Sequence, residues 1–219
     1  MVQLFQIQSP KLASIPLSEG LQVRIGEGWV TQWKMDGFFA LKEFNGCIIA
    51  GEQMRDGTFW AFDIAVMQGE DCRQTPYRYR LSALTSLSKS FPESIKLIPS
   101  GVGSEFLEAV LKAGGEGVVF KRLGTTWGKG QYKCKREETF DAVVSARNES
   151  TRSLSLIQYK DGSPLDCGNV ASLSKEEWET IKVGDVLEIK CQCRHKSGKF
   201  REPRIFRTRP DKPAAECLA

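Results

Sequence analysis

Two dipeptides that form tight turns separate three apolar runs in the first part of the chain. Asn45-Gly46 lies between FFALKEF and CIIAGEQM, and Asp56-Gly57 lies between AGEQMR and TFWAFDIAV. Asn-Gly and Asp-Gly favour hairpin turns because their central positions require a positive φ. We therefore expect residues 38–66 to form an antiparallel meander, which restricts this part of the chain to folds that contain an antiparallel sheet.

Two helices and two further strands are expected after the meander. Thr75 and Pro76 provide an N-cap and a first helical residue, ahead of apolar residues spaced along one helix face. A second apolar stripe begins near Ser104 and stops at Gly114-Gly115, a pair that ends helices. The runs GVVFKR and YKCKRE then have the composition of strands. These elements predict a mixed α/β domain with antiparallel sheets.

The sequence pattern changes at Asp141, after which short strands dominate. DAVVSA, LSLIQYK and DVLEIKCQC are typical strand sequences, and a capping box at Ser174 opens a short helix that ends near Gly184. Short strands with one small helix are typical of a small β-barrel such as an OB-fold. We therefore predict an α+β protein. Its mixed α/β domain covers residues 1–137, and its OB-fold β-barrel covers residues 138–219.

Charge and hydropathy restrict the environment of the protein more than its activity. The net charge of +4 is compatible with a polyanionic partner but does not require one. The N-terminal residues show no basic segment followed by an apolar run, and no window approaches the roughly 20 apolar residues of a membrane span. We expect a cytoplasmic protein with no signal peptide and no membrane partner.

The cysteines and the single histidine give little support for metal or triad chemistry. Seven cysteines without paired spacing are typical of reduced thiols. Cys191, Cys193 and His195 would share one face of a strand, but no fourth zinc ligand lies at a suitable spacing. One histidine does not favour a Ser-His-Asp triad, and the chain has no phosphate loop of the Walker type.

Lysines and carboxylates recur beside glycines at the ends of the expected strands. Each one alone is most often a solvent-facing charge, and a lone KxDG occurs by chance in many proteins. The ordered set is a stronger signal than any of its members. Its segments are WKMDG (33–37), GE (51–52), AFDI (61–64), EGVVFK (116–121), YKCK (132–135) and REPRIFRTRPDK (201–212).

In this order the segments resemble the motifs of the covalent nucleotidyltransferase superfamily, which contains ATP-dependent DNA ligases, RNA ligases and mRNA capping enzymes. The resemblance extends from about residue 30 to residue 212, and the last segment is most similar to the DNA ligase branch. It implies that residues 1–137 form an adenylation (nucleotidyltransferase) domain. It also implies an ATP-dependent DNA ligase that seals nicks between a 5′-phosphate and a 3′-hydroxyl in duplex DNA.

The resemblance implies a set of catalytic residues. Lys34 matches the lysine that attacks the α-phosphate of ATP and carries AMP to the nick. An ordinary lysine is neutral in roughly one molecule in a few thousand at pH 7, and neighbouring cations favour the neutral amine that attacks. Lys133 and Lys135 match those cations. Glu116 matches a ligand of Mg²⁺, which Mn²⁺ could replace, and Asp36 is expected near the metal and at the strand-joining step.

The resemblance also implies nucleotide contacts. Phe62 matches the aromatic residue that stacks on adenine, a contact that contributes roughly 1–3 kcal/mol, and Glu52 should lie near the ribose. In the barrel, Arg209 and Lys212 match cations that orient the pyrophosphate leaving group. The expected nucleotide-binding residues are Gln32, Trp33, Lys34, Glu52, Phe62, Lys121, Lys133, Lys135, Arg209 and Lys212.

Two departures from the family pattern leave the substrate open. Phe39 stands where ligases usually carry an arginine. The short interval between Lys34 and Glu52 also lacks the usual strand with a ribose-contacting arginine, for which Arg55 is a candidate replacement. Phe39 favours the alternative of an RNA or polynucleotide ligase, whereas the last motif favours a DNA ligase.

Two further alternatives use the same residues less well. A capping guanylyltransferase shares the motifs in looser form, and a non-catalytic OB-fold nucleic-acid-binding protein would not need its lysines. The presence of Lys34, Lys133 and Lys135 favours an enzyme. We therefore expect a monomer, cytoplasmic or of viral origin and acting in host cytoplasm, that binds ATP and nicked duplex DNA. Without further DNA-binding domains, its DNA affinity should fall steeply with salt.

Overall fold

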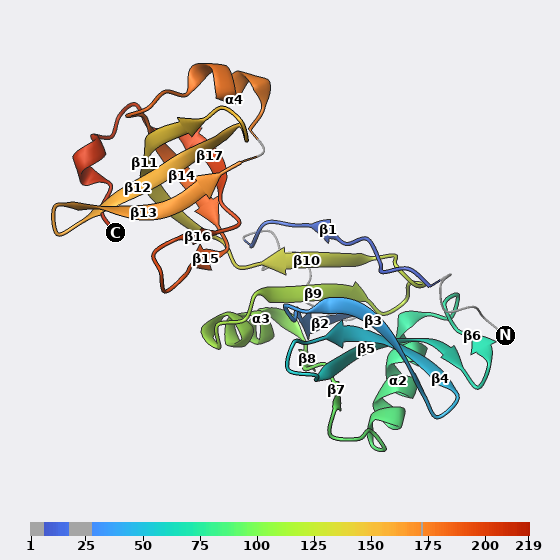
Figure 1. Cartoon of the computed structure of the whole chain (residues 1–219). Helices are drawn as coiled ribbons and strands as arrows, with labels where there is room; N and C mark the ends of the chain where they lie inside the picture. Colours follow the sequence, from blue (N-terminus) through green and yellow to red (C-terminus); the bar gives the residue numbers. More distant parts are fainter. Residues whose placement is uncertain (1–6, 18–27, 172) are drawn as a thin grey trace. The chain divides into compact units, whose positions relative to one another are not determined.

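The computed structural model describes residues 7–17, 28–171 and 173–219 (Figure 1). The chain divides into two compact units, Met1–Lys135 (unit 1) and Arg136–Ala219 (unit 2). Unit 1 combines helices and sheets and unit 2 is mostly strands, which confirms the predicted α+β class. None of the helices in the described ranges is long and apolar enough to cross a membrane.

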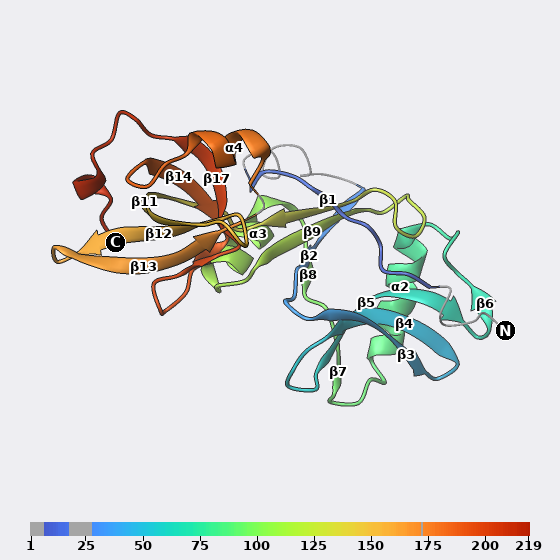
Figure 2. The same ribbon diagram turned by 45° about the horizontal axis from the view of Figure 1, so that its top comes forward.

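The first sheet of unit 1 contains the strand that precedes Lys34. Its strand order is β1-β10-β9-β2-β8, and α3 packs against β2 and β9 (Figure 2). Leu107 and Val110 of α3 are buried together with Val118 and Phe120 of β9, which fixes the helix on the sheet. The elements are β1 (Ala13–Ser14), β2 (Trp29–Trp33), β8 (Ser100–Gly101), α3 (Gly103–Lys112), β9 (Gly117–Arg122) and β10 (Gln131–Lys135).

The predicted meander forms the second sheet of unit 1, with the order β3-β4-β5-β6 and with β7 parallel to β5. Asn45 and Gly46 adopt φ values of 49° and 72° in the β3–β4 turn, which confirms the predicted hairpin. Helix α2 packs on β5 and buries Tyr77 and Leu84. The elements are β3 (Phe38–Phe44), β4 (Cys47–Gln53), β5 (Phe59–Met67), β6 (Glu70–Asp71), α2 (Tyr77–Ser88) and β7 (Ile95–Leu97).

Unit 2 contains a five-stranded antiparallel sheet with the order β13-β12-β11-β14-β17. Register shifts in the β11–β12, β12–β13 and β14–β17 pairs bend the sheet, as β-bulges do. A curled, partly open five-stranded sheet is the architecture of an OB-fold. The elements are β11 (Glu138–Asn148), β12 (Ser153–Lys160), β13 (Ser163–Val170), α4 (Lys175–Thr180), β14 (Val186–Cys191), β15 (Cys193–Arg194), β16 (Phe200–Arg201), β17 (Arg204–Thr208) and the short 3-10 helix η2 (Ala214–Glu216).

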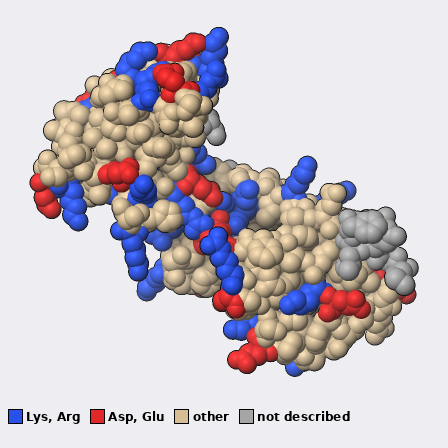
Figure 3. Space-filling model, in the orientation of Figure 1, with Lys and Arg blue, Asp and Glu red and all other residues tan. Residues whose placement is uncertain are grey.

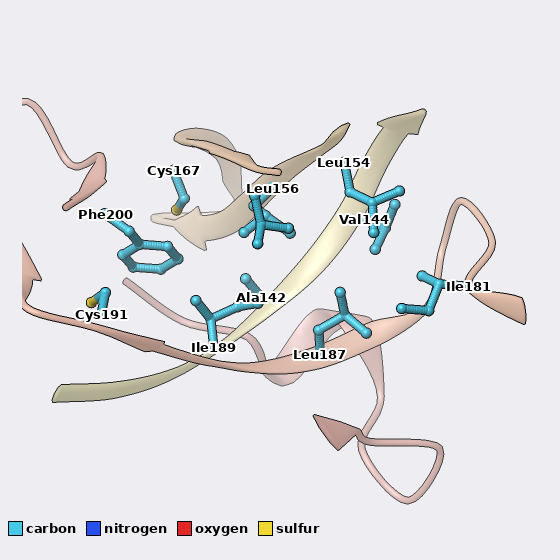
Figure 4. Packing of buried hydrophobic residues seen from close by; sticks show 11 residues of the cluster. Ala142, Val144, Leu154, Leu156, Cys167, Ile181, Leu187, Ile189, Cys191 and Phe200 are labelled. Atoms are coloured by element: carbon cyan, nitrogen blue, oxygen red, sulfur yellow. The ribbon is translucent and has the colours of Figure 1, made fainter. Parts of the chain in front are cut away.

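The curled sheet encloses one apolar core (Figure 4). Its strands alternate between core-facing and outward residues, so Leu154 and Leu156 of β12 point inward with Leu187 and Ile189 of β14. Phe140 stacks on Phe200 next to this core, with ring centroids 5.2 Å apart. The core therefore lies inside unit 2 and leaves its charged residues on the surface.

Two predicted helix boundaries were wrong by short distances. Helix α4 ends at Thr180 rather than near Gly184, because Ile181 is already extended with φ −74° and ψ 131°. Its predicted capping box is confirmed. In α2, Pro76 is the N-cap instead of the first helical residue, so the helix begins at Tyr77.

The predicted strand DVLEIKCQC is divided in the structure, so Cys191, Cys193 and His195 do not share one strand. Strand β14 ends at Cys191, and Cys193 belongs to β15, which pairs with β16 in a separate ribbon. Among the described residues, no group of three His, Cys, Asp or Glu side chains is placed to hold a metal ion. The seven cysteines are free thiols, as predicted.

Candidate functional site

Lys34 directly follows β2, beside the start of β9. Its backbone N–H donates to the Gly117 carbonyl oxygen at 2.9 Å, which places its side chain next to Glu116. The distance from Lys34 Nζ to Glu116 Oε2 is 2.5 Å, and Lys135 Nζ lies 3.1 Å from Glu116 Oε1. The Glu116 side chain is only 5% exposed. Two ammonium groups thus share one largely buried carboxylate, and three of the predicted site residues meet there.

Two motif glycines are required by close backbone approaches around this contact. Gly117 has a φ of 147°, and a Cβ at this position would lie 2.1 Å from the Cys134 carbonyl oxygen. A Cβ on Gly37 would lie 2.6 Å from the Gln53 carbonyl oxygen. Glycine alone fits both positions. Gly117 therefore keeps β9 close to β10, and Gly37 keeps the segment after Lys34 close to the end of β4.

A pocket opens beside Lys34, between the two sheets of unit 1. Lys133 and Lys135 lie outside its lining and share one face of β10, since they are two residues apart on a strand. The predicted nucleotide-binding residues that line it are Gln32, Trp33, Lys34, Glu52, Phe62 and Lys121.

Gln32 gives the pocket an unsatisfied polar group. Its side chain is 1% exposed, and its Nε2 makes no hydrogen bond to a described residue, although the amide adjoins the Tyr77 hydroxyl. A buried donor without a partner is costly, and a ligand atom that accepts its proton removes that cost. The pocket therefore combines an aromatic wall at Phe62 with a donor that a bound heterocycle can satisfy.

Carboxylates gather at the Lys34 end of the pocket. Burial raises the pKa of Glu52 above its ordinary value; Lys34 opposes this shift, and Glu116 and Asp36 add to it. Lys34, Glu116 and Asp36 therefore all lie within electrostatic reach of Glu52. Asp36 is exposed, whereas Glu52 is half-buried. The structure thus brings Asp36 and Glu52 to the same region as the Lys34–Glu116 pair.

The donor set around Glu116 fits a magnesium ion that takes most of its ligands from phosphate and water. Mg²⁺ binds through one or two carboxylates together with substrate phosphates. Glu116 offers one buried carboxylate, and Asp36 and Glu116 both act on the charge of Glu52. Because Lys34 and Lys135 already pair with the two Glu116 oxygens, a cation there would share the carboxylate with them.

In unit 2, the predicted cations Arg209 and Lys212 converge on Asp141. Arg209 Nη1 lies 3.2 Å from Asp141 Oδ1, and Lys212 Nζ lies 2.7 Å from Asp141 Oδ2. Asp211 binds the other edge of the Arg209 guanidinium at 2.8 Å, and this hydrogen bond lowers the pKa of Asp211 to about 2. Both cations are therefore paired with carboxylates of their own unit.

The Arg209 pairs belong to a wider charge pattern in unit 2. Residues 190–212 contain nine Lys and Arg residues against two carboxylates. Figure 3 shows Lys and Arg side chains gathered where Figure 1 places β15 and β16. Arg207 pairs with Glu188 at 2.6 Å, and Lys199 pairs with Asp166 at 3.1 Å. Surface carboxylates from the other strands thus hold much of this basic segment.

The sequence motifs missed the N-terminal wall of the pocket. Ser9, Pro10 and Leu12 line it, together with residues from both sheets. This segment is held by β1, which pairs in parallel with β10, and by Ile7, which is buried against Ala65 and Val66. A two-residue strand is too short for a periodic signal, so no sequence pattern marks these residues.

Several solved structures have the same fold as this chain. A Lig E DNA ligase, described as binding DNA with a minimal scaffold, matches with a TM-score of 0.67 at 18% identity, over 93% of this chain and 100% of that chain. A mycobacterial DNA ligase D in complex with ATP matches with a TM-score of 0.54 at 17% identity, over 96% and 97% of the two chains. The ligase domain of M. tuberculosis LigD matches with a TM-score of 0.51 at 17% identity, over 95% and 98%. No protein-family model and no curated protein matches the sequence.

Proposed function

We propose that this chain, which has the fold of minimal ATP-dependent DNA ligases, seals nicks in duplex DNA through a lysyl-AMP intermediate on Lys34. One observation carries the proposal: Lys34 shares the buried carboxylate of Glu116 with Lys135, beside a pocket that Phe62 and the unpartnered Gln32 amide line. A nucleophilic amine, cations for phosphate oxygens and an aromatic wall for a base are the groups that lysine adenylylation requires.

The pocket chemistry supports ATP as the nucleotide. Phe62 offers a ring face for stacking on adenine, a contact that contributes roughly 1–3 kcal/mol. The Gln32 amide can donate to a ring nitrogen of the base, and the Glu52 carboxylate can accept from ribose hydroxyls. Lys34 would then lie at the phosphate end, since it lines the same pocket.

In the first step the Lys34 amine attacks the α-phosphorus, a nitrogen–phosphorus bond forms, and the bond to pyrophosphate breaks. An ammonium has no free electron pair, so the attack requires that Lys34 releases a proton to solvent and that its ion pair with Glu116 opens. Lys133 and Lys135 would face charge on the α-phosphate oxygens. A magnesium ion held by Glu116 would neutralise further phosphate charge.

We assign Arg209 and Lys212 to the pyrophosphate leaving group of this first step. Their present partners are carboxylates, so phosphate oxygens would replace or supplement Asp141. The AMP then passes to the 5′-phosphate of the nick, and the 3′-hydroxyl attacks that phosphate and releases AMP. Asp36, an exposed carboxylate two residues after Lys34, is assigned to this strand-joining step.

Phe39 favours a second candidate, an RNA or polynucleotide ligase. It lies opposite Glu52 in the β3–β4 pairing, and its ring centroid is 6.3 Å from that of Phe62. An apolar ring therefore stands near the pocket where ligases usually carry an arginine. This change alters nucleotide or strand contacts, but it leaves the Lys34 site intact.

The test combines labelled nucleotides with nicked substrates. We expect α-labelled ATP and Mg²⁺ to label the protein covalently, and the labelled protein to seal a nicked all-DNA duplex. Labelling by GTP alone would contradict the ligase assignment. Efficient joining of RNA ends with little sealing of nicked DNA would instead support the second candidate. The DNA affinity should also fall steeply with salt, as expected for binding through phosphate contacts.

A further inference from the structure

A buried lysine lies over the ring that forms the aromatic wall of the pocket. Lys121 on β9 is 3% exposed. Its Nζ lies 4.4 Å from the Phe62 ring centroid and 4.8 Å from the Tyr77 ring centroid, and it donates to the Phe62 carbonyl oxygen at 3.3 Å. The ammonium therefore contacts both the backbone and the ring of Phe62.

The backbone around Phe62 is held from several sides. Its carbonyl oxygen also accepts from the Tyr77 hydroxyl at 2.9 Å. The next residue, Asp63, binds the Arg80 guanidinium through both carboxylate oxygens, at 2.9 Å and 3.1 Å. These bonds fix the main chain but leave the orientation of the Phe62 ring to its own contacts. A cation over an aromatic face is attracted by the ring quadrupole, so Lys121 favours one ring orientation.

We propose that Lys121 is a positioning residue, whose ammonium holds the Phe62 ring in the orientation that stacks on adenine and thereby makes ATP affinity depend on the protonation of one buried amine. The inference rests on the proposed function, because it takes the pocket as the ATP site. It differs from the expectation drawn from the sequence, in which Lys121 contacts the nucleotide itself.

The surroundings of Lys121 make its charge sensitive to pH. Burial lowers the pKa of Lys121 from 10.5 to about 8; Asp63 opposes this shift and Arg80 adds to it. The charged and titratable groups that face it are Asp63 on β5 and Tyr77 and Arg80 on α2. Burial also raises the pKa of Tyr77 well above its ordinary value, so this phenol stays neutral. As the pH rises through about 8, the Lys121 ammonium loses its proton and the attraction for the ring weakens.

The first experiment compares Lys121→Met with Lys96→Met. Methionine keeps an unbranched apolar stem and removes the charge. Lys96 is a matched control, because its Nζ lies 5.6 Å from the Trp60 ring centroid at an exposed position outside the pocket lining. Protein freed of AMP is mixed with labelled ATP at pH 7, and the rate of protein adenylylation is measured against ATP concentration.

We expect the half-saturating ATP concentration of Lys121→Met to rise about tenfold, which is ~1.4 kcal/mol and within the range of desolvated cation–π contacts. The maximal rate should change by less than about twofold, since Lys121 acts through the ring and not on the phosphates. Lys96→Met should behave as the wild type. An unchanged half-saturating concentration in Lys121→Met would overturn the inference.

A double-mutant cycle separates action through Phe62 from direct contact with ATP. If Lys121 acts through the ring, Lys121→Met should add no further loss of affinity to Phe62→Ala. An equal tenfold loss in both backgrounds would mean that Lys121 contacts the nucleotide itself, which contradicts the inference.

A pH series tests the same point without relying on the folding of one variant. The half-saturating ATP concentration of the wild type should rise from pH 7 to pH 9, while that of Lys121→Arg, which stays charged, should not. The same value at both pH values in the wild type would overturn the inference. If the wild type forms no adenylate at any pH, the proposed function itself fails. Normal adenylylation by Lys121→Met removes only the role of Lys121.

Discussion

Each unit contains a carboxylate held between two cations, and the two arrangements differ mainly in burial. Glu116 in unit 1 pairs with two lysines at 2.5 Å and 3.1 Å, and its side chain is 5% exposed. Glu137 in unit 2 pairs with Lys190 at 3.0 Å and with Arg204, and its side chain is 27% exposed. The same three-charge pattern therefore occurs beside a pocket in unit 1 and near the surface in unit 2, where Asp141 between Arg209 and Lys212 is a second example.

Burial decides what such a pattern does. An exposed ion pair contributes about 0–1 kcal/mol because water and salt screen it. A buried carboxylate has lost its water, so removal of its charge leaves two cations uncompensated in a low-dielectric site. The comparison supports the proposed role of the Glu116 site in adenylylation. The surface cations of unit 2 can exchange their carboxylate partners for phosphate at little cost.

The largest expected effect comes from removing the amine of the buried site. Lys34→Ala should fold normally and should lower protein adenylylation by roughly 10⁵-fold or to background, since no other group replaces a covalent nucleophile. Labelling with α-labelled ATP measures the loss, and circular dichroism checks the fold. The control is Lys42→Ala, whose lysine lies over the Phe59 ring at 5.0 Å outside the pocket lining. Full nick sealing by Lys34→Ala would refute the assignment of the nucleophile.

Replacing Glu116 and Glu137 each by glutamine tests whether burial distinguishes the two sites. Glu116→Gln should lower the adenylylation rate by roughly 100- to 1000-fold, because it removes a buried charge that orients Lys34 and Lys135. Glu137→Gln should leave that rate unchanged and should alter the free energy of unfolding by less than about 1 kcal/mol. Single-turnover labelling and thermal unfolding measure the two quantities. Similar effects of the two substitutions would show that burial does not distinguish the sites.

The part of the fold that local residues specify could be predicted from the sequence. The Asn45-Gly46 hairpin and the Ser174 capping box depend on a few adjacent residues, and both are present. Strand β13 was not predicted, because Pro164 and Gly168 interrupt the alternation that marks a strand. It forms through pairing with β12, a tertiary interaction that no local pattern contains.

The ordered motifs predicted which residues belong to the candidate site, but not how these residues are arranged in space. Lys34 and Glu116 are 82 positions apart, and their contact requires the pairing of β2 with β9. The resemblance named both residues, but the spacing between them could not place them together. The wall at Leu12 and the burial of Lys121 next to Phe62 depend on how the segments pack, so only the structure reveals them.

A smaller and step-specific effect is expected from the half-buried Arg209 of unit 2. Arg209→Ala should lower the rate of protein adenylylation by roughly 100-fold, as expected for loss of one charge-stabilising group. Sealing of a nick that already carries 5′-AMP should be nearly unchanged, because pyrophosphate takes no part in that step. Arg207→Ala is the control, since Arg207 pairs with Glu188 and is more exposed. An equal loss in both steps would place Arg209 on the DNA and not on the leaving group.

The smallest expected effect is the response of stability to alkaline pH, and its sign differs between the units. Lys121 has a pKa of about 8 when folded and an ordinary value of 10.5. The unfolded chain therefore binds more protons between these values, and stability should rise with pH across that window, by at most about 1.4 kcal/mol per pH unit.

Lys212 in unit 2 should respond in the opposite sense. Its hydrogen bond to Asp141 raises its pKa above 10.5, so its contribution to stability is present at neutral pH and is lost as pH rises through the higher value. Chemical denaturation at pH 7, 9 and 10 should therefore show a rise in the wild type that Lys121→Met lacks and Lys212→Met keeps. If the stability of Lys121→Met rose with pH by the same amount, the rise would have to come from a group other than Lys121. Loss of the Lys121 proton should therefore have two opposite effects. It should stabilise unit 1, because a neutral amine costs less free energy to bury than an ammonium. It should weaken ATP binding, because only the ammonium holds the Phe62 ring.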